Sequence, residues 1–353
     1  MKKRLISSAV LFALLLCSTF VANAQTATAI DTTKPLSGTY SLGYDDSADF
    51  NSLADAIRIL RRCGVSGPVR ILVKNGTYNS LIIRDSIPGS SAKNTITFRS
   101  FTGPRDSVRI YDTYGAKLVN TCHLRFEELT LEGIMVGVQM DSSVNDVEIR
   151  HCNILAQLSS NYLYKGIEYP GNATTLDRRM CNVRIIANNI RGGYVNIHLN
   201  NYCSNSNLND TDFNCVTIDS NLLCDAFYYG FYSQQNGIVN SFSHNTVTNY
   251  HPDFKYYGLY SSSRHKWGRV DGNRIHINNN LLGYGLYFGR NFNQQNKKPA
   301  IICNNEIIIG DSSAKYGLYV ESPEGACEVI NNSILIQSPT LSYGLYLGNS
   351  NTG

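Results

Sequence analysis

The chain has 353 residues, a formal net charge of +4 and only 16% charged residues. This weakly basic balance argues against nucleic-acid binding, which requires lysine and arginine clustered along one surface. The 23 tyrosines and 28 glycines, with abundant asparagine and serine and a single tryptophan, favour repeated strands and tight turns over helices.

The first 24 residues are predicted to be a signal peptide. Residues 2–4 are basic, residues 5–21 are apolar, and Ala-Asn-Ala at 22–24 forms a small-residue cleavage site. Leu16 stands where a lipoprotein site needs a small residue before Cys17, so lipid anchoring is not expected. No later segment approaches about 18 continuous apolar residues, so we expect a secreted or cell-surface protein without a transmembrane segment.

A leader segment is assigned to residues 25–48, and a helix is predicted over residues 50–62. Its apolar residues share one helical face, and Gly64 ends it. Less regular strands are expected downstream, at residues 69–73, 81–83, 95–98, 108–111 and 124–131.

Two sequence signatures then repeat in alternation. The first is apolar-x-apolar-x-x-Asn-x-apolar, and its Asn position holds Cys152, Asn188, Asn221, Asn245, Asn273, Asn305 and Asn332. The second is Tyr-Gly-(Leu/Phe)-Tyr, found at residues 229–232, 257–260, 284–287, 316–319 and 343–346. Its glycines are 28, 27, 32 and 27 residues apart.

Such a period, made of short alternating strands, predicts one solenoid turn per repeat. We therefore predict an all-β, right-handed parallel β-helix over residues 49–353, with the helix capping its N-terminal end. Each repeated Asn is expected to adopt left-handed backbone angles and to join an internal ladder of amide hydrogen bonds. Because an uncovered coil exposes strand edges, the end at Gly353 indicates further coils or a C-terminal sorting or anchoring domain.

Nine of the ten cysteines follow the signal peptide, so at least one thiol should stay free. Cys203 and Cys215 flank a polar loop and are the best candidates for a disulfide. The alternative for the others, such as Cys152 and Cys303, is a small buried core residue. No CxxC pair suggests a zinc site, and no calcium-loop motif occurs, although scattered calcium sites in turns stay open.

Residues 50–78, with Ala56-Ile57, Val69-Arg-Ile-Leu-Val73 and Asn75-Gly-Thr-Tyr78, resemble the N-terminal cap and first coil of pectin-lyase-like proteins. The later coils look like β-helix repeats of large surface proteins from Bacteroidetes-type bacteria. The resemblance covers residues 38–353 and implies the fold, which lyases, hydrolases, esterases, epimerases and adhesins share. The Gln-Asp-Thr-Leu of pectinesterases, the Gly-His-Gly of polygalacturonases and the Trp-x-Asp-His of pectate lyases are absent.

In the resembled families, the sheet that holds the Tyr-Gly-Leu-Tyr strands carries the substrate groove on its outer face. Its Leu and Phe residues should point inward, and the glycines should face outward as a shallow strip. Alternation then places five tyrosines outward and in register: Tyr232, Tyr260, Tyr287, Tyr319 and Tyr346. These rings are candidates for binding sugar rings, or they simply stack on one another as cross-strand pairs.

In earlier coils, the same alternation places Asp141, Glu168 and His198 on this outer face, together with Gln139 and Asn196. Two carboxylates and a histidine suit acid–base chemistry on a glycan, and solvated polar side chains are the alternative. Arg264-His265-Lys266 either adds positive charge beside the groove, useful for acidic glycans, or is a solvated loop. The segment His251-Pro252-Asp253 is expected to be a solvated turn.

Two hypotheses about function result. In the first, the chain is a secreted or surface β-helix that binds polysaccharide through its tyrosines or serves as an adhesin or stalk. In the second, it is a divergent polysaccharide lyase or glycoside hydrolase that uses Asp141, Glu168 and His198. Its oligomeric state is left open.

Overall fold

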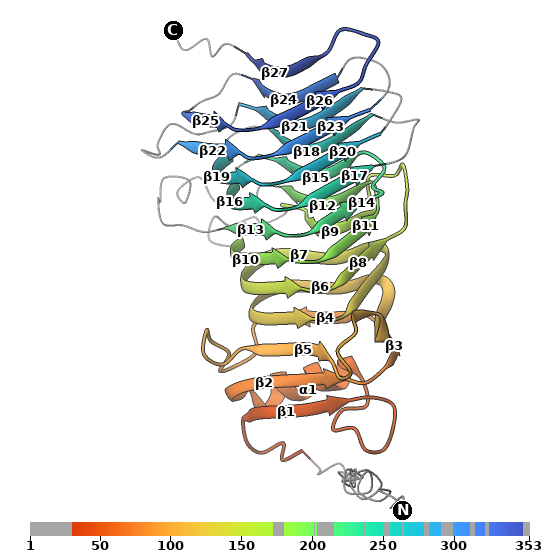
Figure 1. Ribbon diagram of the computed structural model, residues 1–353. Coiled ribbons are helices and arrows are strands. Elements are labelled where there is room, and N and C mark those ends of the chain that lie inside the picture. The colour runs from red at the N-terminus through yellow and green to blue at the C-terminus, as the bar shows by residue number, and fades with distance from the viewer. Residues whose placement is uncertain are drawn as a thin grey trace, which may run out of the picture.

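The computed structural model describes residues 30–171, 180–200, 202, 215–235, 237–249, 255–262, 265–278, 282–290, 299–310, 315–321 and 325–348. Its strands are wound into a solenoid in which all pairs between neighbouring coils are parallel (Figure 1). The predicted right-handed parallel β-helix is therefore confirmed. No helix in the described ranges is long and apolar enough to cross a membrane.

The strands form three parallel stacks. β6 (Val108–Glu127) and β7 (Thr130–Arg150) each run through all three. The first stack further contains β1 (Leu36–Leu42), β2 (Val65–Val73), β5 (Ile96–Ser100), β10 (Met180–Ile186), β13 (Val216–Asp219), β16 (Gly237–Ser243), β19 (His265–Asp271), β22 (Ala300–Cys303) and β25 (Cys327–Ile330). The second contains β3 (Gly76–Tyr78), β8 (Asn153–Ala156), β11 (Asn189–Gly192), β14 (Leu222–Cys224), β17 (Thr246–Asn249), β20 (Arg274–Ile277), β23 (Glu306–Ile309) and β26 (Ser333–Ile336).

The third stack is called the tyrosine stack below. Each of its strands follows a second-stack strand in the chain. It contains β4 (Leu81–Arg84), β9 (Lys165–Tyr169), β12 (Val195–Asn200), β15 (Tyr229–Gln234), β18 (Tyr256–Ser262), β21 (Gly283–Gly289), β24 (Lys315–Glu321) and β27 (Tyr343–Leu347).

At the N-terminal end, helix α1 (Leu53–Cys63) packs against β1 and β4. It starts three residues later than predicted because the Ser52 hydroxyl caps it by accepting a hydrogen bond from the Asp55 amide. Gly64 ends it with a φ of 70°. The β-structure begins earlier than residue 49, because β1, within the predicted leader segment, pairs with β2. A 3₁₀ turn, Arg105–Ser107, precedes β6.

The interior contains the predicted asparagine ladder at the turn from the first stack to the second. The amide of Asn245 donates to the carbonyl of Ile218 and to Oδ1 of Asn273, and its own Oδ1 accepts two hydrogen bonds from Asn221. The same pattern links the ladder residues Asn188, Asn221, Asn245, Asn273, Asn305 and Asn332. These amides satisfy backbone groups that burial would otherwise leave without a partner.

The left-handed backbone angles fall elsewhere than predicted. The residue before each ladder asparagine, not the asparagine itself, has a positive φ, as in Ser220 (59°) and His244 (55°). The ladder asparagine is already directed inward by this turn, which leaves its amide free to bond along the solenoid axis. The sequence pattern identified the turn but assigned the left-handed backbone angle to the wrong residue.

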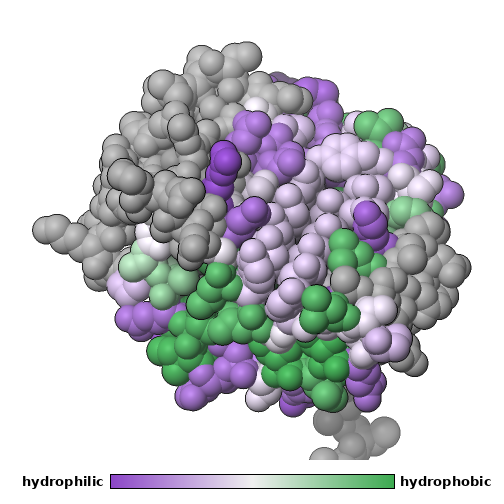
Figure 2. Space-filling model, turned by 90° about the horizontal axis from the view of Figure 1, so that it is seen from above, coloured by the Kyte–Doolittle hydropathy of each residue, from purple (hydrophilic) through white to green (hydrophobic). Residues whose placement is uncertain are grey.

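The cysteines show both expected roles. Cys215 forms a disulfide, and its predicted partner Cys203 lies outside the described residues. Cys152 is a buried thiol in the hydrophobic core, as expected, whereas Cys303 is buried outside that core and donates a hydrogen bond to Asp271 at 3.2 Å. In the last coil, side chains whose counterparts are buried elsewhere lie exposed: Leu345 is 47% exposed, whereas Leu318 in the preceding coil is 0%. Figure 2 looks onto this end and shows apolar surface along one side of it.

Candidate functional site: the outer face of the tyrosine stack

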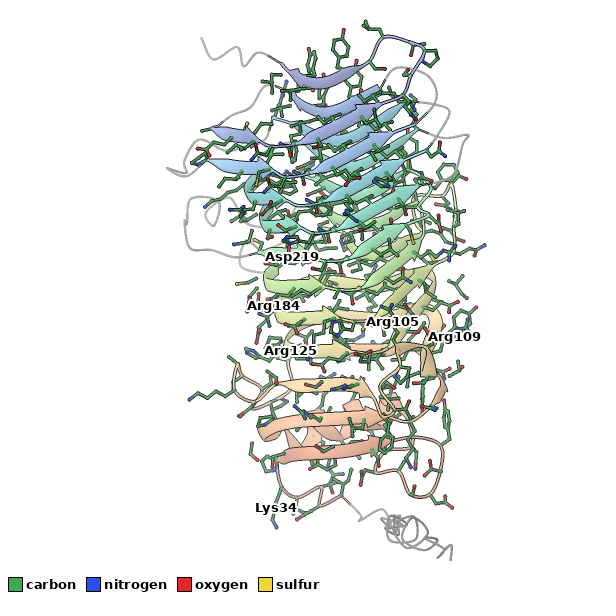
Figure 3. All side chains as sticks on the ribbon, in the orientation of Figure 1. Lys34, Arg105, Arg109, Arg125, Arg184 and Asp219 are labelled. Atoms are coloured by element: carbon green, nitrogen blue, oxygen red, sulfur yellow. The ribbon has the colours of Figure 1, made fainter. Side chains whose placement is uncertain are left out.

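Many charged side chains on the first two stacks form ion pairs. Arg125 contacts Asp146 at 2.7 Å on the first stack, and Arg109 contacts Glu132 at 2.7 Å on the second. Figure 3 labels both arginines, which lie on opposite sides of the solenoid in that view. Such pairs link consecutive coils through side chains rather than leaving them available to a partner. The tyrosine stack has a different surface.

Every strand of the tyrosine stack after β4 places two side chains, three residues apart, on its outer face. In β18, Tyr257 and Tyr260 are both half-buried, whereas Gly258 and Leu259 between them are buried. A Cβ on Gly258 would lie 2.7 Å from the Ile275 side chain in the core and 2.6 Å from the next glycine's carbonyl oxygen. The glycines therefore face inward, and the predicted outward strip of glycines is wrong. Simple alternation fails because the strand kinks at each glycine.

This kink produces two continuous columns of outward side chains. The first column contains Tyr114, Val136, Lys165, Val195, Tyr229, Tyr257, Tyr284, Tyr316 and Tyr343. The second contains Lys117, Gln139, Glu168, His198, Tyr232, Tyr260, Tyr287, Tyr319 and Tyr346. The sequence-predicted tyrosines thus do align, and they share one column with Glu168 and His198.

The tyrosines pack in a herringbone. In the second column, the rings of Tyr260 and Tyr287 stack with centroids 4.6 Å apart and planes 2° apart. In the first column, Tyr257 and Tyr284 stack at 4.7 Å and 5°. Across the columns the rings are perpendicular from Tyr257 onward, as for Tyr284 and Tyr287 at 88°, whereas Tyr229 and Tyr232 stack at 17°. The two columns therefore combine the offset-stacked and edge-to-face geometries that aromatic pairs prefer.

Stacking determines which part of each ring is available. Ring faces are largely shared with neighbours, and burial raises the pKa of Tyr284 to about 12. The hydroxyl of Tyr287 donates a hydrogen bond to Glu321 at 2.7 Å, one coil further on. Tyr232, predicted to be exposed, is only 8% exposed because Tyr229, Tyr260 and other rings surround it. The cross-strand stacking considered from the sequence is present, and the strip offers mainly ring edges and hydroxyls.

Glu168 and His198 face outward as expected, but they are not open to solvent. Glu168 is 8% exposed and His198 is 2% exposed. The Glu168 carboxylate accepts hydrogen bonds from Lys165 at 2.6 Å and from Gln139 at 2.9 Å. The His198 ring lies nearby, with Nδ1 4.0 Å from Glu168 Oε1. The predicted open groove is absent at this point because a loop side chain covers the pair.

That side chain is Tyr162, from the loop between β8 and β9. Its hydroxyl is 2.8 Å from His198 Nε2, and its ring packs edge-on against His198 and Tyr232. The Lys165 ammonium lies 4.2 Å from the centre of the Tyr162 ring. Burial, and then the charge of Lys165, lowers the pKa of His198 to about 3. At neutral pH this imidazole is therefore uncharged.

The third candidate, Asp141, does not lie opposite Glu168 or His198 in the strand pairing. Gln139, not Asp141, is the residue of β7 that lies opposite Glu168. The Asp141 carboxylate accepts a hydrogen bond from the neighbouring Ser142 amide at 2.7 Å. Asn196, predicted to face outward, is buried and donates to the carbonyls of Gly192 and Cys224. A catalytic role for Asp141, Glu168 and His198 stays a prediction.

Of the basic segment next to the tyrosines, the two described residues are buried, which fits neither an exposed charge nor a solvated loop. His265 is 0% exposed and Lys266 is 9% exposed, while Arg264 lies outside the described residues, as does the segment 251–253. Within the described ranges, no group of three or more His, Cys, Asp or Glu side chains is arranged to hold a metal ion.

Sequence reasoning missed Lys165, Tyr162 and the first tyrosine column. Lys165 was detectable, because Lys165-Gly-Ile-Glu168 repeats the Tyr-Gly-Leu-Tyr pattern with charged residues at its ends. The first-column tyrosines belong to the same signature and were missed only because strict alternation was assumed. Tyr162 lies in a loop without periodicity, so no sequence signal placed it over His198.

No protein-family model matches this chain, and no curated protein is detectably similar to it. Among solved structures, rice weevil pectin methyl esterase is similar over 87% of this chain and 90% of its own, with a TM-score of 0.45 and 10% identity. Escherichia coli YbhC is similar over 94% of each chain, with a TM-score of 0.45 and 12% identity. The Azotobacter vinelandii mannuronan C-5 epimerase AlgE4 A-module is similar over 92% of this chain and 99% of its own, with a TM-score of 0.25 and 13% identity. Similarity at this level assigns neither a family nor an activity to this chain.

Proposed function

We propose that this chain is an exported β-helix that binds a polysaccharide along the tyrosine stack. The observation that carries the proposal is the alignment of the second column, which runs from Gln139, Glu168 and His198 into five tyrosines without a break in register. A polymer with repeating hydroxyl groups is matched by a surface that repeats its own hydroxyls once per coil.

The chemistry of the strip favours a glycan over a protein partner. Tyrosine hydroxyls both donate and accept hydrogen bonds, and the exposed parts of the rings add apolar contact area. The rings are already held by stacking, so little conformational entropy is lost when a ligand binds. Glycan binding here depends on hydroxyls and edges more than on sugars stacked over ring faces.

The test is binding of a panel of neutral and acidic polysaccharides to the protein and to the double variant Tyr260→Ala/Tyr287→Ala. Tyr260→Phe/Tyr287→Phe is the matched control, because it keeps the stack and removes only the hydroxyls. We expect affinity to fall in both variants, and further in the alanine variant. Unchanged binding in the alanine variant, with circular dichroism matching the wild type, would place the glycan elsewhere on the protein.

A second candidate function is glycan cleavage by a lyase or glycosidase mechanism, favoured by the adjacent acid–base groups Glu168, His198 and Tyr162. The Tyr162 hydroxyl lies 2.8 Å from His198 Nε2, His198 Nδ1 lies 4.0 Å from Glu168, and Lys165 balances the charge of Glu168. Release of unsaturated or reducing ends from the same panel, lost in Glu168→Gln and His198→Ala with the fold intact, would support it. Binding without product release would leave the binding function alone.

A further inference from the structure

The covered pair Glu168 and His198 lies in a recess at one end of the tyrosine strip. The recess is the space that the Tyr162 ring fills over this pair, where the ring contacts His198, Tyr232 and Lys165. The Tyr162 side chain has a six-membered ring. Its hydroxyl lies at His198 Nε2, and one face of the ring is turned toward the Lys165 ammonium. A ring with a hydroxyl group is also the basic unit of a glycan.

The loop that supplies Tyr162 is weakly tied to the protein. Leu158, Tyr162 and Leu163 are 43%, 43% and 53% exposed. In the described structure, the other side-chain hydrogen bonds of residues 157–164 are local ones, from backbone amides to Ser159 and Asn161. Displacement of Tyr162 therefore has to break mainly the contacts of its own ring and hydroxyl with His198, Tyr232 and Lys165, because the rest of the loop adds little.

The recess also has hydrogen-bonding capacity that Tyr162 does not use. His198 Nδ1 and Gln139 Oε1 are fully enclosed and have no hydrogen-bond partner. Both atoms flank the Glu168 carboxylate, since Gln139 and His198 lie opposite Glu168 on either side. A buried polar atom without a partner is costly, and a ligand or water bearing hydroxyls relieves that cost.

We propose that Tyr162 is an intramolecular occupant of a sugar-binding recess, and that a terminal or branching sugar of the bound glycan displaces it. The sugar would bond His198 Nε2 through one hydroxyl and reach Gln139 Oε1 or His198 Nδ1 through others. This inference rests on the proposed glycan-binding function and adds a second, regulated part to that site. It makes Tyr162 a competitor of the ligand, not part of the binding surface.

Access to the recess is testable without any glycan. Diethyl pyrocarbonate adds an ethoxycarbonyl group to a neutral, accessible imidazole nitrogen. Because His198 is neutral at pH 6, the rate at which it is modified reports how exposed its ring is. We expect slow modification of His198 in the wild type and in Leu163→Ala, the matched loop control. Modification should be faster in Tyr162→Phe, which loses the hydrogen bond, and fastest in Tyr162→Ala. Peptide mass spectrometry identifies the modified residue, and an unchanged rate in Tyr162→Ala overturns the proposal.

Glycan titration then distinguishes a competitor from a contact. The wild type, Tyr162→Ala and Leu163→Ala are titrated with the tightest-binding polysaccharide of the panel. Affinity is expected to rise about fivefold to tenfold in Tyr162→Ala, because the ligand no longer has to break the hydrogen bond between Tyr162 and His198. Affinity should stay constant in Leu163→Ala. Lower affinity in Tyr162→Ala would make Tyr162 a glycan contact and overturn the proposal. If no variant binds any glycan, the proposed function itself fails, whereas the His198 rates still show whether Tyr162 covers the recess.

Discussion

Lys165 donates a hydrogen bond from Nζ to Glu168 Oε1 at 2.6 Å, although the two side chains are only 3% and 10% exposed. Residues three apart in a regular strand point to opposite faces. Here the kink at Gly166 places both on the outer face, where Tyr162 then covers them. A buried ion pair of this kind is costly to break, because removal of one partner leaves the other charge without compensation.

Lys165→Met should therefore be strongly destabilising. We expect a loss of about 3–5 kcal/mol in the free energy of unfolding, measured by urea denaturation. The double variant Lys165→Met/Glu168→Gln should recover most of it, since no buried charge remains. Additive losses in the double variant would show that the pair is solvated rather than buried.

Stability should fall as the pH is lowered below about 6.5, through His198. Its pKa is lowered from 6.5 to about 3 in the folded protein, so the unfolded chain binds a proton in this range and the folded chain does not. Each pH unit between these values then costs up to about 1.4 kcal/mol. The groups that face this ring are Lys165, Glu168 and Tyr162. The measurement is urea unfolding at pH 7 and at pH 5, because this interval covers the unfolded pKa of histidine.

His198→Gln is the control for that pH dependence. Glutamine can accept the Tyr162 hydrogen bond but does not titrate. The variant should lose the part of the slope that His198 causes, while the other histidines keep theirs. Equal slopes in the wild type and the variant would mean that His198 titrates with an ordinary pKa in the folded protein.

The asparagine ladder should be a major source of stability. Asn245→Ala removes the donor to the Ile218 carbonyl and the acceptor for the Asn221 amide, and both groups are buried. We expect a loss of about 2–4 kcal/mol by urea unfolding, from two unsatisfied groups. Asn278→Ala, at an exposed position, should change stability by less than about 0.5 kcal/mol. Equal effects of the two substitutions would argue against the ladder.

Two equivalent glycines allow a test of the strand kink. A Cβ on Gly258 would meet Gly285 and Ile275 at 2.6 and 2.7 Å, whereas one on Gly344 would have nothing within 4 Å. Gly258→Ala should therefore lower the free energy of unfolding by about 1–3 kcal/mol through overpacking. Gly344→Ala should be nearly neutral. A tolerated Gly258→Ala would show that the glycine is not required by close packing.

The sequence predicted the fold well because the fold is periodic. Identical residues such as Asn221 and Asn245 recur once per coil, and their stacking follows from the period alone. The errors arose where local geometry departs from a regular strand. Gly258 turns inward and brings Tyr257 outward, and Ser220 rather than Asn221 carries the left-handed angle.

By itself, the sequence determined the winding of this protein, because side chains that repeat with the period must lie over one another in a solenoid. It also determined which column holds Glu168, His198 and the tyrosines. Only the tertiary structure decided that the tyrosine rings stack on one another and that Tyr162 covers His198. Those contacts depend on strand kinks and on a loop of irregular sequence, and neither has a period from which a contact follows.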